Sequence, residues 1–196
     1  MVDLLPLVGD PPPERSDAVR NRELLLRAAH ALVARCGVEA VTTDAVATEA
    51  GVGKGTVFRR FGSREGLMTA VLDDSEKAWQ AAVISGEPPL GPGAPPWDRL
   101  VALGRSRLET TLLNADLIRA AGGFGRRSGP AHLFTVLHVR HLLRELGVTG
   151  DLPMLATALL APLEVPLLDP DLRRADFPVD RVLESWTDLA RRIVRE

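Results

Sequence analysis

Apolar residues recur along this chain at the spacing of an α-helix. The first such stripe runs at intervals i, i+3, i+4, i+7 and i+11 and consists of Leu25, Ala28, Ala29, Leu32 and Cys36. Residues spaced in this way share one face of an amphipathic helix and are expected in a core. Alternating runs bounded by hairpin turns are nearly absent, and the chain has no tyrosine. The pattern predicts an all-α protein of about nine helices.

Glycine and threonine residues indicate where the first helices begin and end. Gly37 follows the first stripe, where a left-handed residue commonly ends a helix. Thr42 offers an N-cap oxygen to a short second helix, and Gly51 ends that helix. A third short helix is expected to begin near Gly53 and to end at Gly62.

A run rich in proline and glycine, together with helical periodicity, predicts the linker, domains and helices of the rest of the chain. The run "GEPPLGPGAPPW" predicts a linker over about residues 86–96. We expect a flexible leader over residues 1–17, a helix-turn-helix domain over 18–66 and a second helical domain over 67–196. Further helices are expected over residues 63–85, 97–113, 115–121, 130–146, 152–168 and 179–194.

Charge is unevenly distributed along the chain. The 196 residues carry a net charge of −2, but residues 15–66 hold nine Arg or Lys against six acids, a net +3 that leaves −5 on the remainder. A basic N-terminal third suggests contact with a polyanion. One cysteine cannot form an internal disulfide, and the N-terminus lacks the pattern of a signal peptide, so we expect a soluble, cytoplasmic protein.

The stretch "AGVGKGTVFRRFGSREGL", residues 50–67, permits two interpretations. A phosphate-binding P-loop needs its first glycine five residues before Gly53, where the chain has Thr48, and it needs a preceding buried strand, where the pattern predicts helix. The alternative is a helix-turn-helix unit, in which Ala50 and Gly51 allow a tight turn between two short helices. The context favours the second interpretation, with Val46, Val52, Val57 and Phe61 as its core.

The span from Arg20 to Leu72 resembles the N-terminal domain of the tetracycline-repressor-like (TetR) family of transcriptional regulators. The resemblance is carried by "LLRAAHALVARCGVEAVTTDAVATEAGVGKGTVFRRFGSREGLMTAVL", about a quarter of the chain. It implies a DNA-binding regulator, with an N-terminal three-helix DNA-binding domain followed by a helical domain for ligand binding and dimerisation. Two departures stand out: Gly53 replaces a common capping serine, and Phe58 replaces the usual tyrosine, which removes a phenolic hydroxyl from the expected phosphate contacts.

The resemblance implies a set of DNA contacts. Thr42 and Thr43 would bind phosphates, Arg59 and Arg60 would reach guanine edges or nearby phosphates, and Arg64 would bind a phosphate. The full set expected at the DNA is Thr42, Thr43, Lys54, Gly55, Thr56, Phe58, Arg59, Arg60 and Arg64. The implied partner is a double-stranded DNA operator, bound as a homodimer and released by a small-molecule effector, which most simply describes a repressor.

The resemblance also places an effector pocket among the middle helices and a dimer interface on the last two. Candidate pocket residues are Trp79, Leu103, Arg107, Phe124, Phe134 and His138. Candidate interface residues lie on two apolar stripes: Met154, Leu155, Ala158, Leu159, Val182, Trp186, Leu189 and Ile193. The loop "GGFGRRSG" is either a gate to the pocket or a plain connection.

Catalytic and metal chemistry find little support in the pattern. His138 and His141 lie three residues apart, but no cysteine pair or acidic cluster completes a metal site, and no nucleophile–base set can be assembled. We expect no cofactor, no membrane partner and no enzymatic activity. The alternative function is an all-α small-molecule-binding or enzymatic protein whose helix-turn-helix no longer binds DNA.

Overall fold

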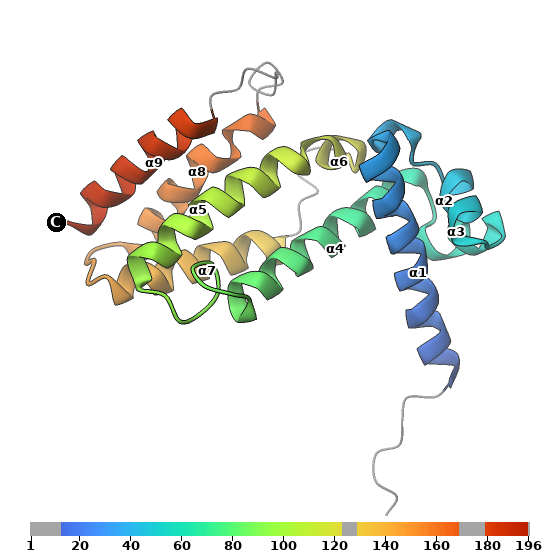
Figure 1. The fold of residues 1–196 in the computed structure, drawn as a ribbon, viewed down its shortest axis with the longest axis horizontal. Coiled ribbons are helices and arrows are strands. Elements are labelled where there is room, and N and C mark those ends of the chain that lie inside the picture. The colour runs from blue at the N-terminus through green and yellow to red at the C-terminus, as the bar shows by residue number, and fades with distance from the viewer. Residues whose placement is uncertain (1–12, 123–128, 169–178, 196) are drawn as a thin grey trace, which may run out of the picture. The chain divides into compact units, whose positions relative to one another are not determined.

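The computed structural model describes residues 13–122, 129–168 and 179–195, and these residues form helices and turns without any strand (Figure 1). The elements are α1 (Pro13–Cys36), the short 3-10 helix η1 (Val38–Ala40), α2 (Thr43–Ala50), α3 (Lys54–Phe61), α4 (Arg64–Ser85), α5 (Pro96–Leu113), α6 (Ala115–Ala120), α7 (Gly129–Glu145), α8 (Leu152–Leu168) and α9 (Val179–Val194). The predicted all-α fold class is confirmed. The chain divides into two compact units, residues 1–71 and 72–196, and α4 passes through the division.

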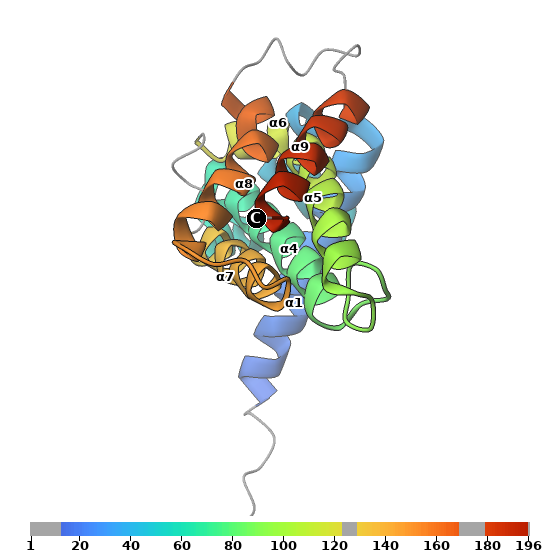
Figure 2. The ribbon, with the colours of Figure 1, turned by 90° about the vertical axis from the view of Figure 1, so that its left-hand side faces the viewer.

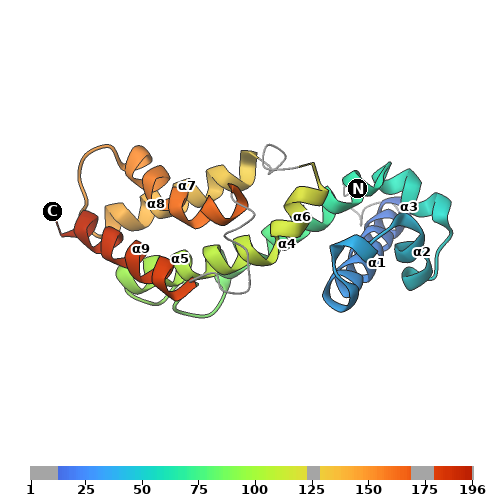
Figure 3. The same ribbon diagram turned by 90° about the horizontal axis from the view of Figure 1, so that it is seen from above.

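The first unit is built around the inner faces of three helices. In α1, Leu25 and Ala29 are buried, and they are joined by Val46 of α2 and Val57 of α3, both with no exposed surface. α2 packs against α1 and against α3, an arrangement that Figure 3 shows from above. Burying each of the larger side chains, Leu25, Val46 and Val57, contributes about 1.5–3 kcal/mol, which is enough to fix how short helices of eight residues pack.

Both ends of α1 differ from the sequence prediction. The helix begins at Pro13, so residues 13–17 of the expected leader are helical, which suits a proline that lacks a backbone N–H at the first helical position. At the other end Cys36 is exposed, although it was expected in the core. Gly37, with φ of 78°, turns the chain there, and Val38 fills the buried position instead.

The second unit is organised around α5, which packs against α7, α8 and α9. α7 packs against α8, and α8 and α9 run side by side (Figure 2). The core contains Leu100, Leu103, Leu142, Leu159 and Leu163, each nearly or fully buried. These residues come from three different helices, so the core joins helices that are distant in the sequence.

Trp186 of α9 fixes a close approach between three of these helices. Its indole is 2% exposed, and its Nε1 donates to the carbonyl of Leu159 in α8 at 2.7 Å. On α5, Gly104 provides the space for the ring: a Cβ at that position would lie 2.3 Å from the indole carbons. The tryptophan therefore satisfies its polar atom while filling the gap that glycine leaves.

Candidate functional site

The first part of the candidate site is the start of α2. Thr42 has an extended backbone, and its Oγ1 accepts a hydrogen bond from the Ala45 amide at 3.1 Å, so the predicted N-cap is present. Thr43, the next residue, is partly exposed, and its hydroxyl donates to the Asp44 carboxylate at 3.4 Å. Both hydroxyls thus lie at the positive end of a helix, where an anion is favoured.

The turn between α2 and α3 determines how α3 is presented. Gly51 adopts the left-handed conformation, with φ 66° and ψ 31°, and the Val52 amide donates to the carbonyl of Ala47 at 2.9 Å. Only glycine adopts this conformation without strain. α3 then begins after Gly53, which is extended and provides no side-chain cap.

The outer face of α3 is basic and exposed. Lys54 is close to Asp44 of α2, with Nζ 2.8 Å from a carboxylate oxygen, and both side chains are well exposed. Gly55 is exposed with open space around it, and Thr56 is partly exposed. The three remaining residues that were expected at the DNA on this helix, Phe58, Arg59 and Arg60, are all exposed, Phe58 by 63%.

Arg64, at the start of α4, has protein partners. Its guanidinium donates to the carbonyls of Val41 and Val38, both at 2.9 Å, and lies 3.5 Å from the carboxylate of Glu39. These bonds tie α4 to the connection between α1 and α2. The structure therefore gives Arg64 a positioning role that the sequence did not predict.

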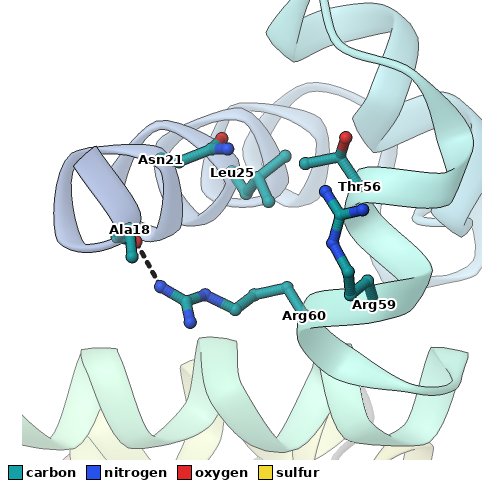
Figure 4. A pocket seen from close by; sticks show the side chains of 6 residues that line it. All are labelled: Ala18, Asn21, Leu25, Thr56, Arg59 and Arg60. Carbon is teal, nitrogen blue, oxygen red and sulfur yellow. Dashed lines mark hydrogen bonds between the residues drawn. The ribbon is translucent and has the colours of Figure 1, made fainter. Parts of the chain in front are cut away.

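A hollow of about 290 Å³, the α1–α3 hollow, lies beside the basic face of α3. It is lined by Ala18, Asn21, Leu25, Thr56, Arg59 and Arg60 (Figure 4). Arg60 donates a hydrogen bond to the carbonyl of Ala18 in α1. The sequence analysis did not single out Asn21. Its position shows only that it lies one helical turn before Leu25, and it belongs to no recognisable DNA-binding motif.

A buried polar cluster lies in the second unit, between α4 and α5. Arg107 is 1% exposed, and its Nη1 lies 3.0 Å from both carboxylate oxygens of Glu76. Its guanidinium also lies 4.8 Å from the ring centre of Trp79, a cation–π contact. Trp79 in turn donates from Nε1 to the Ser106 hydroxyl at 2.9 Å.

Some hydrogen-bonding capacity in this cluster is unused within the described part of the chain. There, Arg107 Nε and Thr111 Oγ1 are buried and make no hydrogen bond. These residues are four apart in α5, so both lie on one face of that helix. Unsatisfied buried polar atoms are costly, so each of them needs a physical explanation. Burial also raises the pKa of Glu164 in α8, against the attraction of Arg107 and of His132.

Aromatic rings extend the cluster toward α7. Phe134 makes an edge-to-face contact with Trp79, at 6.2 Å between ring centres, and stacks on His138 at 6.0 Å. The nearest guanidinium nitrogen of Arg99 lies 3.3 Å from His138 Nε2. Of the predicted pocket residues, Trp79, Arg107, Phe134 and His138 therefore form one connected group; Leu103 is buried in the adjacent core, and Phe124, with most of "GGFGRRSG", lies outside the described residues.

The predicted interface residues on α8 and α9 separate into two groups. Leu159 and Trp186 are buried inside the chain itself, so we remove them from the predicted interface. The reason is that the Trp186 ring lies against Gly104 of α5 and bonds to α8, and that Leu159 belongs to the same buried core, which the width of the apolar band did not reveal. The others keep exposed surface: Met154, Leu155, Ala158, Val182, Leu189 and Ile193.

Two further observations limit the kind of site. Within the residues that the structure describes, no group of three or more His, Cys, Asp or Glu side chains could hold a metal ion. His138 and His141 are neighbours, with ring centres 6.1 Å apart, but His141 lies 3.8 Å from Glu145 on its own helix. In the same part of the chain, no helix combines the length and apolar character that a membrane crossing requires.

The first unit is thus a helix-turn-helix DNA-binding domain, and comparison with known proteins identifies its family. Residues 25–71 match the family "Bacterial regulatory proteins, tetR family". The HTH-type transcriptional regulator SAB2452 of Staphylococcus aureus (strain bovine RF122 / ET3-1) is 36% identical over 58 residues, which is 30% of this chain and 31% of that protein's own length. The match to this family thus covers most of the first unit, and the chain spans about a third of the length of the curated relative that it matches.

Solved structures extend the similarity beyond the first unit. A TetR-family transcriptional regulator from Pectobacterium atrosepticum has a TM-score of 0.66 at 19% identity, over 92% of this chain and 95% of that one. The TetR transcriptional regulator SCO0520 from Streptomyces coelicolor has a TM-score of 0.55 at 26% identity, over 85% and 96%. The multidrug binding protein EbrR, solved in complex with imidazole, has a TM-score of 0.58 at 26% identity, over 95% and 97%.

The environment of His138 predicts a pH-dependent stability. Burial, together with the nearby positive charges of Arg99 and His141, lowers the pKa of His138 from 6.5 to about 4. Between these values the unfolded chain binds a proton that the folded protein does not, so the free energy of unfolding should fall as the pH falls from 6.5 toward 4. Urea denaturation at a series of pH values across this interval measures the effect.

His138→Gln should reduce the slope of this dependence, because it removes the group that titrates. His132→Gln is the matched control, since it changes an exposed imidazole on the same helix that does not contribute to the pKa shift of His138. Equal slopes for the wild type and His138→Gln would contradict the assignment.

Proposed function

We propose that this protein is a ligand-responsive transcriptional repressor that binds a palindromic operator as a homodimer. Residues 18–66 form its DNA-binding domain, and residues 67–196 form its effector-binding and dimerisation domain. The observation that carries the proposal is the exposed basic face of α3, presented by a buried Val57 on the opposite side and by the left-handed turn at Gly51.

In this proposal α3 enters the major groove. Lys54, Thr56, Arg59 and Arg60 then reach base edges or phosphates, and Gly55 allows the backbone to approach the duplex. Thr42 and Thr43 bind a phosphate at the N-terminus of α2. Phe58, being exposed and apolar, contacts sugar or thymine methyl groups in place of the hydrogen bond that a tyrosine would make.

The effector is proposed to bind at the polar cluster around Arg107. This cluster combines aromatic rings with a few convergent polar groups, which is the usual composition of a small-molecule site. Its partners Glu76 and Trp79 lie on α4, the helix whose first turns carry Arg64. A ligand that changes the Arg107–Glu76 pair therefore acts on the helix that continues into the DNA-binding unit, and it shifts operator affinity by its preference for one arrangement over another.

Dimerisation is proposed to use the outer faces of α8 and α9. Met154 is 62% exposed and Leu189 is 39% exposed. Ala158, a small apolar residue, is also exposed. Exposed apolar residues on two packed helices allow a second copy to complete a four-helix interface. Two DNA-binding units held in this way can reach two half-sites, which a single short helix cannot do with useful affinity.

The DNA-binding assignment predicts the behaviour of two variants. Arg59→Ala and Arg60→Ala should each weaken operator binding, by about 1–3 kcal/mol, without unfolding the protein, because both side chains are exposed. Fluorescence anisotropy on an operator selected from genomic fragments, with competitor DNA and a salt titration, measures this. Arg27→Ala is the control, because it removes the same charge from the exposed face of α1. Arg27 lies about half a helical turn from the buried Leu25 and therefore points away from the core. Unchanged affinity in both test variants would remove the α3 assignment.

The effector assignment predicts a variant that loses effector binding without losing stability. Thr111→Val replaces a buried hydroxyl that has no hydrogen-bond partner within the described residues, so the free protein should be as stable as the wild type or more stable. Operator affinity should be unchanged, whereas effectors found by thermal-shift screening should bind more weakly. Thr187→Val, on α9, is the control and should respond normally. Unaltered effector binding by Thr111→Val would contradict the proposed site.

The dimer assignment predicts dissociation by charge. Ala158→Arg places a cation on the exposed face of α8 and should convert the dimer to monomer, because an unpaired charge is costly in an apolar interface. Sedimentation equilibrium measures the state of assembly. Leu113→Arg, at a residue 80% exposed at the end of α5, should leave it unchanged. A dimeric Ala158→Arg protein would show that the copies meet elsewhere.

A further inference from the structure

The α1–α3 hollow has the chemistry of an anion site. Two guanidinium groups, from Arg59 and Arg60, line it from α3, and Figure 4 shows them on two sides of the space. Thr56 adds a hydroxyl and Asn21 adds an amide, while none of the six lining side chains is a carboxylate. Two cations without an acid between them favour an anion, and guanidinium groups suit phosphate oxygens in particular.

Asn21 adds a polar side chain from a second helix to the hollow. It lies on α1, across the space from Arg59 and Arg60 (Figure 4). Its Oδ1 is buried and makes no hydrogen bond within the part of the chain that the structure describes. Because phosphate oxygens accept hydrogen bonds, the group of this side chain that would hold a phosphate is the Nδ2 amide, which is its donor. Arg60 also reaches α1, through its hydrogen bond to the Ala18 carbonyl, so the two walls of the hollow are joined.

The shape of the site distinguishes a phosphate from a base edge. A base edge lies on the floor of the major groove and is reached by side chains that project from a helix. A phosphate projects from the edge of the groove and can enter a concave space between two helices. The apolar floor formed by Leu25, 1% exposed, keeps the hydrogen-bonding groups on the walls.

We infer that the α1–α3 hollow binds one phosphate group of the DNA backbone at the edge of the major groove, held by Arg59, Arg60, Thr56 and Asn21. This inference rests on the proposed function, since it presumes that α3 lies against DNA. It adds α1 to the DNA-binding surface and makes Arg60 a phosphate ligand rather than a reader of bases. The contact contributes affinity that does not depend on sequence.

The first test compares Asn21→Ala with the wild type as full-length protein, on the selected operator and on an unrelated duplex, at several salt concentrations. Asn21→Ala should weaken both complexes by a similar factor, about ten- to a hundredfold for one hydrogen bond to a charged group. Arg60→Ala should weaken both and should also reduce the salt slope by about one. Arg27→Ala is the control for a lost charge elsewhere on α1, and circular dichroism confirms that each variant is folded.

The second test locates the phosphate. Replacing single operator phosphates by neutral methylphosphonates should weaken wild-type binding at one position in each half-site. On the duplex with this methylphosphonate, Asn21→Ala and Arg60→Ala should bind almost as tightly as the wild type, because the contact that they remove is already absent. The inference is overturned if the variants instead lose preference for a particular base pair with an unchanged salt slope, or if every methylphosphonate affects the variants and the wild type alike.

Inorganic phosphate distinguishes a DNA phosphate from a free one. If the hollow serves the backbone, calorimetry with inorganic phosphate alone should detect at most weak binding. Binding at low millimolar concentration that Asn21→Ala abolishes, with operator affinity unchanged, would assign the hollow to a free anion and overturn the inference. A wild-type protein without operator preference would refute the proposed function, and the inference with it; a normal operator complex with an Asn21→Ala variant of full affinity on both duplexes would refute the inference alone.

Discussion

The burial of Val57 against the inner face of the first unit is the constraint on which the DNA-binding surface depends. Because Val57 and Val46 have no exposed surface, α3 cannot rotate about its axis without moving aliphatic side chains into water. That fixed rotation keeps Arg59 and Arg60 outside. The left-handed turn at Gly51 sets where α3 begins, and the bonds from Arg64 to the carbonyls of Val38 and Val41 hold the preceding connection in place.

The second unit combines an aliphatic core with a buried ion pair. Its aliphatic core is continuous, but Arg107 and Glu76 place an ion pair within it, and such a pair costs desolvation free energy that its own attraction only partly offsets. Replacing a buried ion pair by apolar residues of similar volume is often neutral or stabilising, so stability alone does not explain the charges. The proposed effector site would account for them, because an ion pair has partners that a ligand can exchange.

Helical periodicity and turn residues were sufficient to predict most of the fold. The expected bounds of α9 and α8 agree with the structure, and α3 begins one residue after Gly53. Prediction failed where a residue's position on a helix does not determine its neighbours. Cys36 continues the apolar stripe of α1 yet lies beyond the end of the core, and Trp186 belongs to an apolar band that the chain itself covers.

The sequence by itself determined the helices, the turn at Gly51 and the basic composition of α3, because these follow from local spacing and from backbone conformations that few residues adopt. Tertiary structure alone decided which side chains meet across helices. It paired Arg107 with Glu76, 31 residues earlier, and brought Asn21 opposite Arg60. Such pairs depend on how helices cross, and packing between distant segments sets that geometry without leaving a periodic trace in the chain.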